Sequence, residues 1–205
     1  MTIPCSGVIL SGGLSTRFNG ENKALISVGG RYILDRIYDV FSELFKEIIL
    51  VTNHPLQFLH WDFTIVSDLF PVRSSLTGIH AGLFYMKNPA AFFSACDTPF
   101  LKKEVVAALL EKLDENTDII MPETAAGMEP LCAVYSKRCL NAAEHYIKQN
   151  KFKIQRAFGN HRMKKIPEKT LRSIDPDLIS FFNINTSDDL AKAEVIAAKG
   201  REQSP

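Results

Sequence analysis

A glycine-rich, cationic segment follows the first apolar run of the chain, residues 8–10. Gly12 and Gly13 lack the Cβ atoms that would keep a ligand away from the backbone, so several N–H groups can point at one anion. Arg17 and Lys23 add positive charge within the same segment. These residue types suit the binding of a triphosphate. The alternative interpretation is a surface turn whose two cations are solvated.

Asp97 is the carboxylate best placed to act with such a segment. It follows the apolar run 91–95 and precedes Thr98 and Pro99, so it stands at the tip of a predicted strand. A carboxylate beside a triphosphate is unfavourable unless a cation joins them, and Mg²⁺ binds one or two carboxylates together with phosphate oxygens. We therefore expect Asp97 to hold Mg²⁺. The alternative is a structural Asp that turns the chain.

Other polar side chains close strands or loops in the same way. Asp68 ends the predicted strand 63–66 and could bind a nucleoside hydroxyl or base, or cap the next segment. Asn183 and Asn185 flank Ile184, so an extended backbone places both amides on one face. Ligand contact and simple loop stabilisation remain open for both.

The standard catalytic and nucleotide-binding signatures do not occur in the sequence. Neither the P-loop pattern nor G-x-G-x-x-G fits the first glycine pair. The five histidines are scattered, and no nucleophile–base pair stands out. Nucleotidyl transfer needs no such pair, because positioning and charge neutralisation supply most of the catalytic effect.

Alternating apolar patterns predict the elements that position these residues. Buried strands are expected at residues 8–10, 47–52, 63–66 and 91–95, with a shorter one at 132–135. Helical periodicity is found at residues 33–45, 76–87, 102–113, 138–149 and 187–199. This alternation predicts a Rossmann-like α/β fold with a mainly parallel sheet and helices on both faces. In such a sheet, ligands lie at the carboxyl ends of the strands, where the glycine pair, Asp68 and Asp97 would converge.

The remaining segments complete one predicted domain, residues 1–199. Thr186 and Asp189 form a capping box for the last helix, and residues 200–205 are expected to fray. Residues 151–165 are rich in cations, which predicts a solvated face or, alternatively, a site for a second anionic ligand.

Composition limits the classes of function. The net charge of +1 over 205 residues argues against a general nucleic-acid or membrane-surface binder. The first residues lack a signal-peptide pattern, and the four cysteines show neither C-x-x-C nor zinc spacing. We therefore expect a cytoplasmic protein with free thiols.

Four motifs, in order, resemble those of the molybdenum cofactor guanylyltransferases, within the wider nucleotidyltransferase group. The family opening LAGGxSxRMGxDKALL corresponds to LSGGLSTRFNGENKALI here, and D-x(several)-GPLxGI corresponds to Asp68 followed by SLTGI. CDTPFL is identical at residues 96–101, and NINTPEDL corresponds to NINTSDDL at residues 183–190. The resemblance covers most of the chain.

The resemblance implies a nucleotide-diphospho-sugar transferase type of fold and a role for each matched residue. Asp68 would contact the guanosine, Asp97 would bind the nucleotide through Mg²⁺, and Asn183 and Asn185 would line the pterin side. The other expected GTP contacts come from the first motif: Leu10, Ser11, Gly12, Gly13 and Lys23.

Some positions depart from the family pattern. Ser11 replaces Ala and adds a hydroxyl where the backbone must approach phosphate, and Phe18 replaces Met. Ser75 replaces the Pro of GPLxG, which predicts a looser loop. Val51 stands where some members carry Asn.

The resemblance thus implies transfer of GMP from GTP to the terminal phosphate of molybdenum-bearing molybdopterin, with release of pyrophosphate. Residues 151–165 are then a candidate for holding the anionic pterin. Asp97, Lys23 and Arg17 would be the catalytic residues, the two cations neutralising the leaving pyrophosphate. Molybdoenzyme-specific chaperones are the implied protein partners. Alternatives are a related transferase that uses CTP or a sugar phosphate, and a non-catalytic nucleotide-binding adaptor in molybdoenzyme maturation.

Overall fold

The computed structural model describes residues 3–12 and 22–202, with side chains as far as residue 199. The expectations for Gly13, Arg17 and Phe18 lie outside the described residues.

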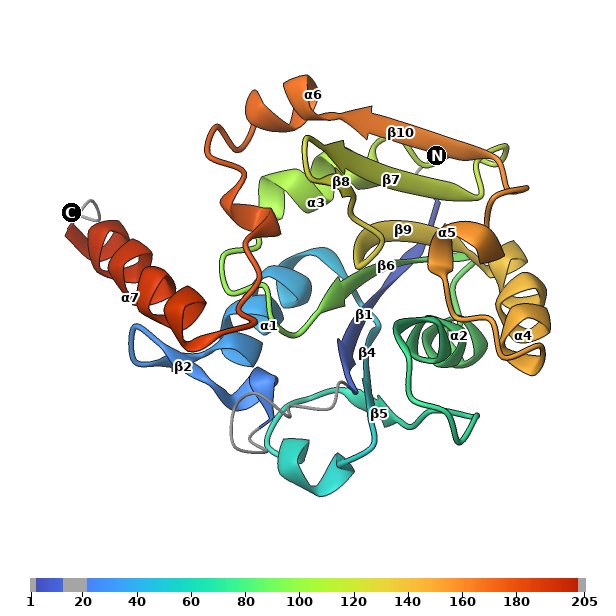
Figure 1. Ribbon diagram of the computed structural model, residues 1–205, viewed down its shortest axis with the longest axis horizontal. Coiled ribbons are helices and arrows are strands. Elements are labelled where there is room, and N and C mark those ends of the chain that lie inside the picture. The colour runs from blue at the N-terminus through green and yellow to red at the C-terminus, as the bar shows by residue number, and fades with distance from the viewer. Residues whose placement is uncertain (1–2, 13–21, 203–205) are drawn as a thin grey trace.

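One mixed sheet forms the centre of the molecule (Figure 1). Its strands lie in the order β10-β7-β9-β6-β1-β4-β5, with β8 beside β7. Pairing is parallel between β1 and its neighbours β4 and β6, between β4 and β5, and between β10 and β7. The strands are β1 (Cys5–Ser11), β4 (Ile48–Thr52), β5 (Thr64–Val66), β6 (Ala90–Ala95), β7 (Ile119–Thr124), β8 (Gly127–Met128), β9 (Cys132–Ser136) and β10 (Met163–Pro167).

Successive strand residues point to opposite sides of the sheet, and apolar side chains lie on both sides. Helices therefore cover both faces. In β1, for example, Ile9 packs with one group of helices and Val8 with the other, and both are fully buried. The first group contains α1 (Ile33–Leu44), α3 (Lys103–Leu110), α6 (Glu168–Arg172) and α7 (Ser187–Glu202). The second contains α2 (Ser75–Tyr85), α4 (Leu140–Lys148) and α5 (Ile154–Ala157).

The predicted fold class is confirmed, and single turns and a small hairpin complete it. The hairpin pairs β2 (Ser27–Val28) with β3 (Arg31–Tyr32). The single turns are η1 (Lys23–Leu25), η2 (Pro55–Phe58), η3 (Lys137–Cys139) and η4 (Ile179–Phe181). Among the helices of the described residues, none is both long and apolar enough to span a membrane.

Strands β7 and β8 and the short helices α5 and α6 were not predicted from the sequence, and two further features of the sheet were also unexpected. Strand β9 runs antiparallel between β6 and β7, so the parallel order is interrupted there. Strand β10 forms one edge of the sheet. It begins inside the cationic stretch 151–165 and ends just after it. Its Lys164 and Lys165 are exposed and only Ile166 is buried, so it lacks the apolar pattern of the inner strands.

Helix α7 begins at Ser187 as predicted. Asp189 Oδ2 accepts hydrogen bonds from the Asn185 and Thr186 amides at 3.0 and 2.9 Å, and the Asp189 amide donates to Thr186 Oγ1. The helix continues to Glu202, beyond the predicted end at Lys199, and the fraying expected for residues 200–205 stays a prediction.

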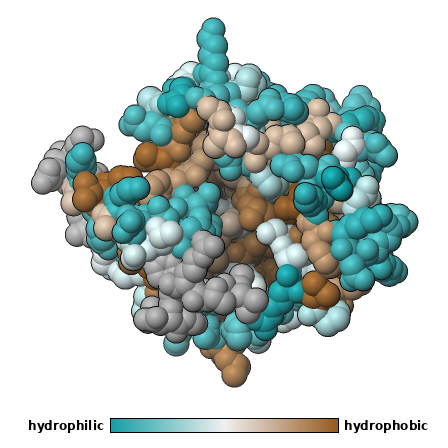
Figure 2. All heavy atoms as spheres, viewed as in Figure 1, coloured by the Kyte–Doolittle hydropathy of each residue, from teal (hydrophilic) through white to brown (hydrophobic). Residues whose placement is uncertain are grey.

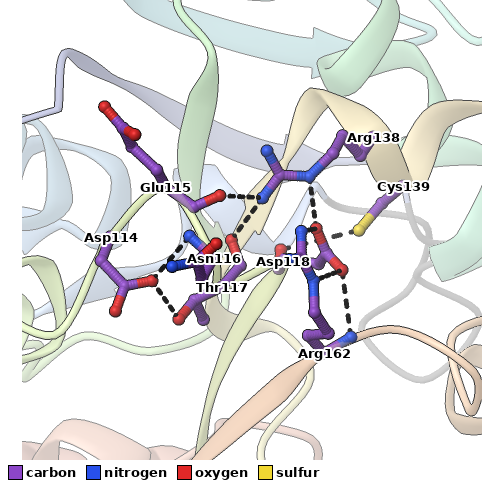
Figure 3. A network of polar contacts seen from close by, with 8 residues as sticks. All are labelled: Asp114, Glu115, Asn116, Thr117, Asp118, Arg138, Cys139 and Arg162. Carbon is purple, nitrogen blue, oxygen red and sulfur yellow. Dashed lines mark hydrogen bonds and ion pairs between the residues drawn. The ribbon is translucent and has the colours of Figure 1, made fainter.

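Three cations of residues 151–165, Arg162, Lys164 and Lys165, pair with acids. Arg162 and Arg138 both bind Asp118 at the start of β7, and Cys139 and Asp114 lie in the same network (Figure 3). Burial raises the pKa of Asp118, but its hydrogen bonds to the two arginines outweigh burial and leave that pKa well below its usual value. Lys164 and Lys165 pair with Asp114 and Glu123. The stretch lines neither cavity described below, so the structure does not support its prediction as a pterin site.

Helix α2 approaches the sheet closely because of Gly82. A Cβ atom at this position would lie 2.6 Å from Phe93 Cε1 and 2.7 Å from Val8 Cγ1, both in the core. We expect Gly82→Ala to lower the free energy of unfolding by about 1–3 kcal/mol through overpacking. Urea denaturation measures this, with Gly159→Ala as the control, since its nearest atom would be 3.4 Å away. Equal stability of the two variants would contradict the close packing.

Candidate active site

A side-chain hydrogen bond joins Ser11 and Asn22, two residues of the first motif. Ser11 Oγ at the end of β1 donates to Asn22 Oδ1 at 3.1 Å, and the same oxygen accepts from the Ala24 amide at 3.2 Å. Asn22 thereby caps η1, whose first residue is Lys23. The Ser11 hydroxyl, which was expected to lie where phosphate approaches, instead contacts Asn22. This contact, through Asn22, fixes the position of Lys23 at the start of η1.

Lys23 lies between two oxygen-bearing side chains from distant parts of the chain. Its Nζ is 3.2 Å from Asp97 Oδ2 and 2.6 Å from Asn185 Oδ1. The Lys23 and Asp97 side chains are 21% and 19% exposed, so solvent reaches the pair only partly. The structure thus joins the first motif, the end of β6 and the segment before α7 at one cation.

The turn after β6 presents Asp97 to this cation. Thr98 Oγ1 donates to the Ala95 carbonyl at 3.0 Å and lies 3.2 Å from Ser94 Oγ. Because Thr98 makes the hydrogen bonds that stabilise the turn, the Asp97 carboxylate is available to Lys23. This geometry argues against the alternative of a purely structural Asp97.

The segment with the two asparagines is attached directly to Asp97. The Ile184 amide donates to the Asp97 carbonyl at 2.9 Å, and the Ile184 side chain is fully buried. Asn183 and Asn185 are exposed on the opposite side and line one cavity, as the alternation predicted.

The buried carboxylate of Asp175 stabilises the chain just before this segment. Asp175 is completely buried, and its Oδ1 is 2.8 Å from Lys102 Nζ, while its Oδ2 accepts from the Ser180 amide at 2.8 Å. Ser180 Oγ in turn accepts from the Lys102 amide at 3.1 Å. Burial raises the pKa of Asp175, but its hydrogen bonds to Lys102 and Ser180 outweigh burial and lower it overall.

We expect Asp175→Asn to lower the free energy of unfolding by about 3 kcal/mol at neutral pH, because it leaves the Lys102 ammonium without its counter-charge. Since the folded-state pKa of Asp175 is depressed, its stabilisation is present above the unfolded pKa, about 4, and is lost as the pH falls below that value. Urea denaturation at several pH values measures this, with the exposed Asp177→Asn as control. A stability difference that does not shrink in acid would contradict this role.

A cavity of about 310 Å³ lies at the carboxyl ends of β1, β4 and β6. Figure 2 shows it as a hollow near the middle of the face, with an apolar floor and hydrophilic residues around it. Its lining includes the predicted Gly12, Asp68 and Asp97. The other lining residues are Leu10, Asn22, Lys23, Val51, Arg73, Ser74, Ser75, Gly78, Ala95, Cys96 and Leu131.

Asp68 offers this cavity a carboxylate with unused hydrogen-bonding capacity. Asn53 Nδ2 donates to its Oδ2 at 2.9 Å, whereas Oδ1 is buried and has no hydrogen-bond partner among the described residues. Burial raises the pKa of Asp68, although Asn53, Arg73 and His80 act in the opposite direction. A Cβ on Gly12 would lie 3.9 Å from Asp68 Oδ2, so the glycine backbone faces this carboxylate.

The N-terminus of α2 forms another wall. Ser74 Oγ accepts from the Thr77 amide at 3.1 Å and Thr77 Oγ1 from the Ser74 amide at 2.9 Å, which is a complete capping box. This cap fixes the start of α2 at Ser75, and the looser loop expected there stays a prediction. The sequence analysis missed this cap, although the S-x-x-T spacing signals it. It also missed Arg73, which brings a further cation to the cavity.

A second cavity of about 270 Å³ adjoins the first, and Ala95, Asp97 and Leu131 line both. Its remaining lining residues are Thr98, Glu129, Pro130, Cys132, Phe181, Asn183 and Asn185. The site therefore offers two adjoining spaces, one on each side of Asp97.

The strand order, together with a cleft at the strand ends, defines the class of nucleotidyltransferase-fold proteins, and solved structures agree. A 2-C-methyl-D-erythritol 4-phosphate cytidylyltransferase from Thermus thermophilus superposes with a TM-score of 0.70, covering 96% of this chain and 100% of its own. At 16% identity this likeness concerns the fold alone.

Comparisons at higher identity specify the family. Residues 7–165 match the profile of the MobA-like NTP transferase domain. A molybdenum cofactor guanylyltransferase of Desulfosudis oleivorans is 45% identical over 96% of this chain and 97% of its own. Molybdopterin-guanine dinucleotide biosynthesis protein A of Archaeoglobus fulgidus is 30% identical, with a TM-score of 0.84 over 95% of this chain and 99% of its own. The chain belongs to the MobA-like NTP transferase family.

Proposed function

We propose that this protein transfers GMP from GTP to the terminal phosphate of molybdenum-bearing molybdopterin and releases pyrophosphate. The observation that carries the proposal is Asp97, which lines two adjoining cavities and pairs with Lys23 at their junction. Two substrates that exchange a nucleotidyl group must meet at one such junction. The substrate classes, a guanine nucleotide and the molybdenum cofactor, are inferred from the activities for which the Desulfosudis and Archaeoglobus relatives are named.

GTP occupies the first cavity in this proposal. Leu10 and Gly12 line the cavity on either side of Ser11, and their backbone is proposed to face the phosphates, while Lys23 and Arg73 supply positive charge. Asp68 offers its unpartnered oxygen to donors of the guanosine. Gly13 and Arg17 keep their proposed phosphate contacts, although they lie outside the described residues.

Asp97 and Asn185 are the residues that would hold Mg²⁺. Their side-chain oxygens converge on one cation, the Lys23 ammonium, and this arrangement supports the proposed cation site. Carboxylate and amide oxygens are also the ligand type that Mg²⁺ prefers. When bound, Mg²⁺ would neutralise the phosphate charges and polarise the α-phosphoryl group.

The chain's own groups then position the reactants. The attacking atom is a phosphate oxygen, which is ionised at neutral pH, so the site needs no general base. Lys23 exchanges its contact with Asp97 for the phosphates and, with Arg17, neutralises the departing pyrophosphate. Asn183 and Asn185 orient the acceptor for in-line attack from the second cavity.

Pyrophosphate release with each nucleoside triphosphate, with and without molybdopterin, tests the proposal. We expect release with GTP and acceptor together, accompanied by incorporation of GMP. Release with CTP instead would favour the cytidylyl alternative, and nucleotide binding without release would favour the non-catalytic adaptor. Addition of a chelator tests Mg²⁺ dependence in the same assay.

The cellular setting is part of the proposal as well. The four cysteines are free, which fits the reducing cytoplasm. Molybdoenzyme-specific chaperones are proposed to receive the product. Co-purification of such a chaperone with this protein would support that partnership.

A further inference from the structure

Glu129 is a carboxylate of the second cavity to which the proposed reaction gives no task. It follows the short β8 hairpin, and its backbone is fixed on both sides: its amide donates to the Pro122 carbonyl at 3.0 Å, and its carbonyl accepts from the Cys132 amide at 3.1 Å. Thr124 Oγ1 donates to its Oε1 at 3.2 Å. A half-buried carboxylate held in this way is a built feature of the cavity.

The charge of the second cavity indicates which part of the acceptor lies near Glu129. Of the described side chains that line it, the two that carry charge, Asp97 and Glu129, are both acidic. A phosphate close to Glu129 would be repelled there, whereas Lys23 attracts one at the other end, beside Asp97. Glu129 therefore suits the end of the acceptor that donates hydrogen bonds.

The first cavity contains a closely similar arrangement. Asp68 is also half-buried and also held by one neutral donor, Asn53, and burial raises the pKa of both carboxyl groups. The proposed substrates share a chemical group: guanine and pterin both carry a 2-amino-4-oxopyrimidine edge with two adjacent N–H donors. A carboxylate can accept both donors of such an edge.

We propose that Glu129 recognises the pterin ring of the acceptor through the N3–H and 2-amino donors of this edge, with Pro130 and Phe181 beside the ring. This inference rests on the proposed function for the identity of the acceptor. Each substrate is then selected by one carboxylate, and the two selecting groups lie on opposite sides of Asp97.

A binding comparison tests the inference without requiring turnover. Pterin and lumazine differ at position 2, where lumazine carries an oxo group in place of the amino group, and the fluorescence of each ring reports binding. We expect the full-length protein to bind pterin at least about tenfold more tightly than lumazine, the scale of a lost charge-assisted hydrogen bond. Glu129→Gln should abolish most of this preference and leave GTP affinity unchanged.

Glu123→Gln is the matched control, because Glu123 pairs with Lys165 on the surface and lines neither cavity. It should keep the preference for pterin. In GMP transfer assays, Glu129→Gln should raise the acceptor KM about tenfold, with kcat and the KM for GTP nearly unchanged.

Three results would overturn the inference: no preference for pterin in the unmodified protein, a preference that survives Glu129→Gln, or a loss of kcat with an unchanged acceptor KM. If the protein transfers GMP but shows no preference, only this inference fails. If it prefers pterin but does not transfer GMP, the proposed reaction fails instead.

Discussion

Replacing Asp97 by Asn is expected to lower kcat for GMP transfer by about 10²–10³-fold, the effect typical of losing one electrostatic contact to a transition state. Asn keeps the size of Asp but removes the charge that faces Lys23 and would bind Mg²⁺. Because the hydroxyl of Thr98 holds the turn, the fold should remain intact. Steady-state rates at saturating GTP and Mg²⁺ measure the loss, and thermal unfolding checks the structure.

Asp114→Asn serves as the matched control, since Asp114 pairs with Lys164 on the surface, away from both cavities. It should transfer GMP at the normal rate. Near-normal transfer by Asp97→Asn in saturating Mg²⁺ would remove Asp97 from the proposed metal role.

The second large effect is expected from Lys23→Ala. Loss of one charge-assisted contact to the phosphates should weaken GTP binding by about 1.5–3 kcal/mol, roughly 10–150-fold. The variant also leaves the Asp97 carboxylate without its cation, so turnover should fall as well. Calorimetric titration with GTP and measurement of kcat separate the two effects.

Lys103→Ala controls for the loss of a lysine, because Lys103 pairs with Glu43 at the surface. It should bind GTP normally. If Lys23→Ala retained both GTP affinity and turnover, its assignment to the nucleotide site would be wrong.

Much of the fold follows from apolar patterning. The inner strands around β1 are buried on both faces, so their runs stand out in the sequence. Strand β10 does not, because an edge strand with two exposed lysines resembles a charged loop. The antiparallel direction of β9 depends on how the chain returns across the sheet, which no local pattern encodes.

The candidate site likewise contains residues that the sequence could indicate and residues that it could not. Gly12 and Asp97 could be predicted because they follow the ends of apolar strands, and Lys23 because it brings a cation to the glycine-rich segment after the first strand. Asp175 and Glu129 could not, since their roles depend on partners brought together only by tertiary structure. The Lys102–Asp175 pair, for example, joins residues far apart in the chain.

The central claim is that Asp97 and Asn185 bind one metal ion beside a nucleotide that engages Lys23. Anomalous diffraction from Mn²⁺, in crystals grown with a non-hydrolysable GTP analogue, tests this directly. We expect a manganese peak within coordination distance of both oxygens, with the Lys23 ammonium moved onto the phosphates. A manganese ion bound elsewhere, with Lys23 still between Asp97 and Asn185, would contradict it.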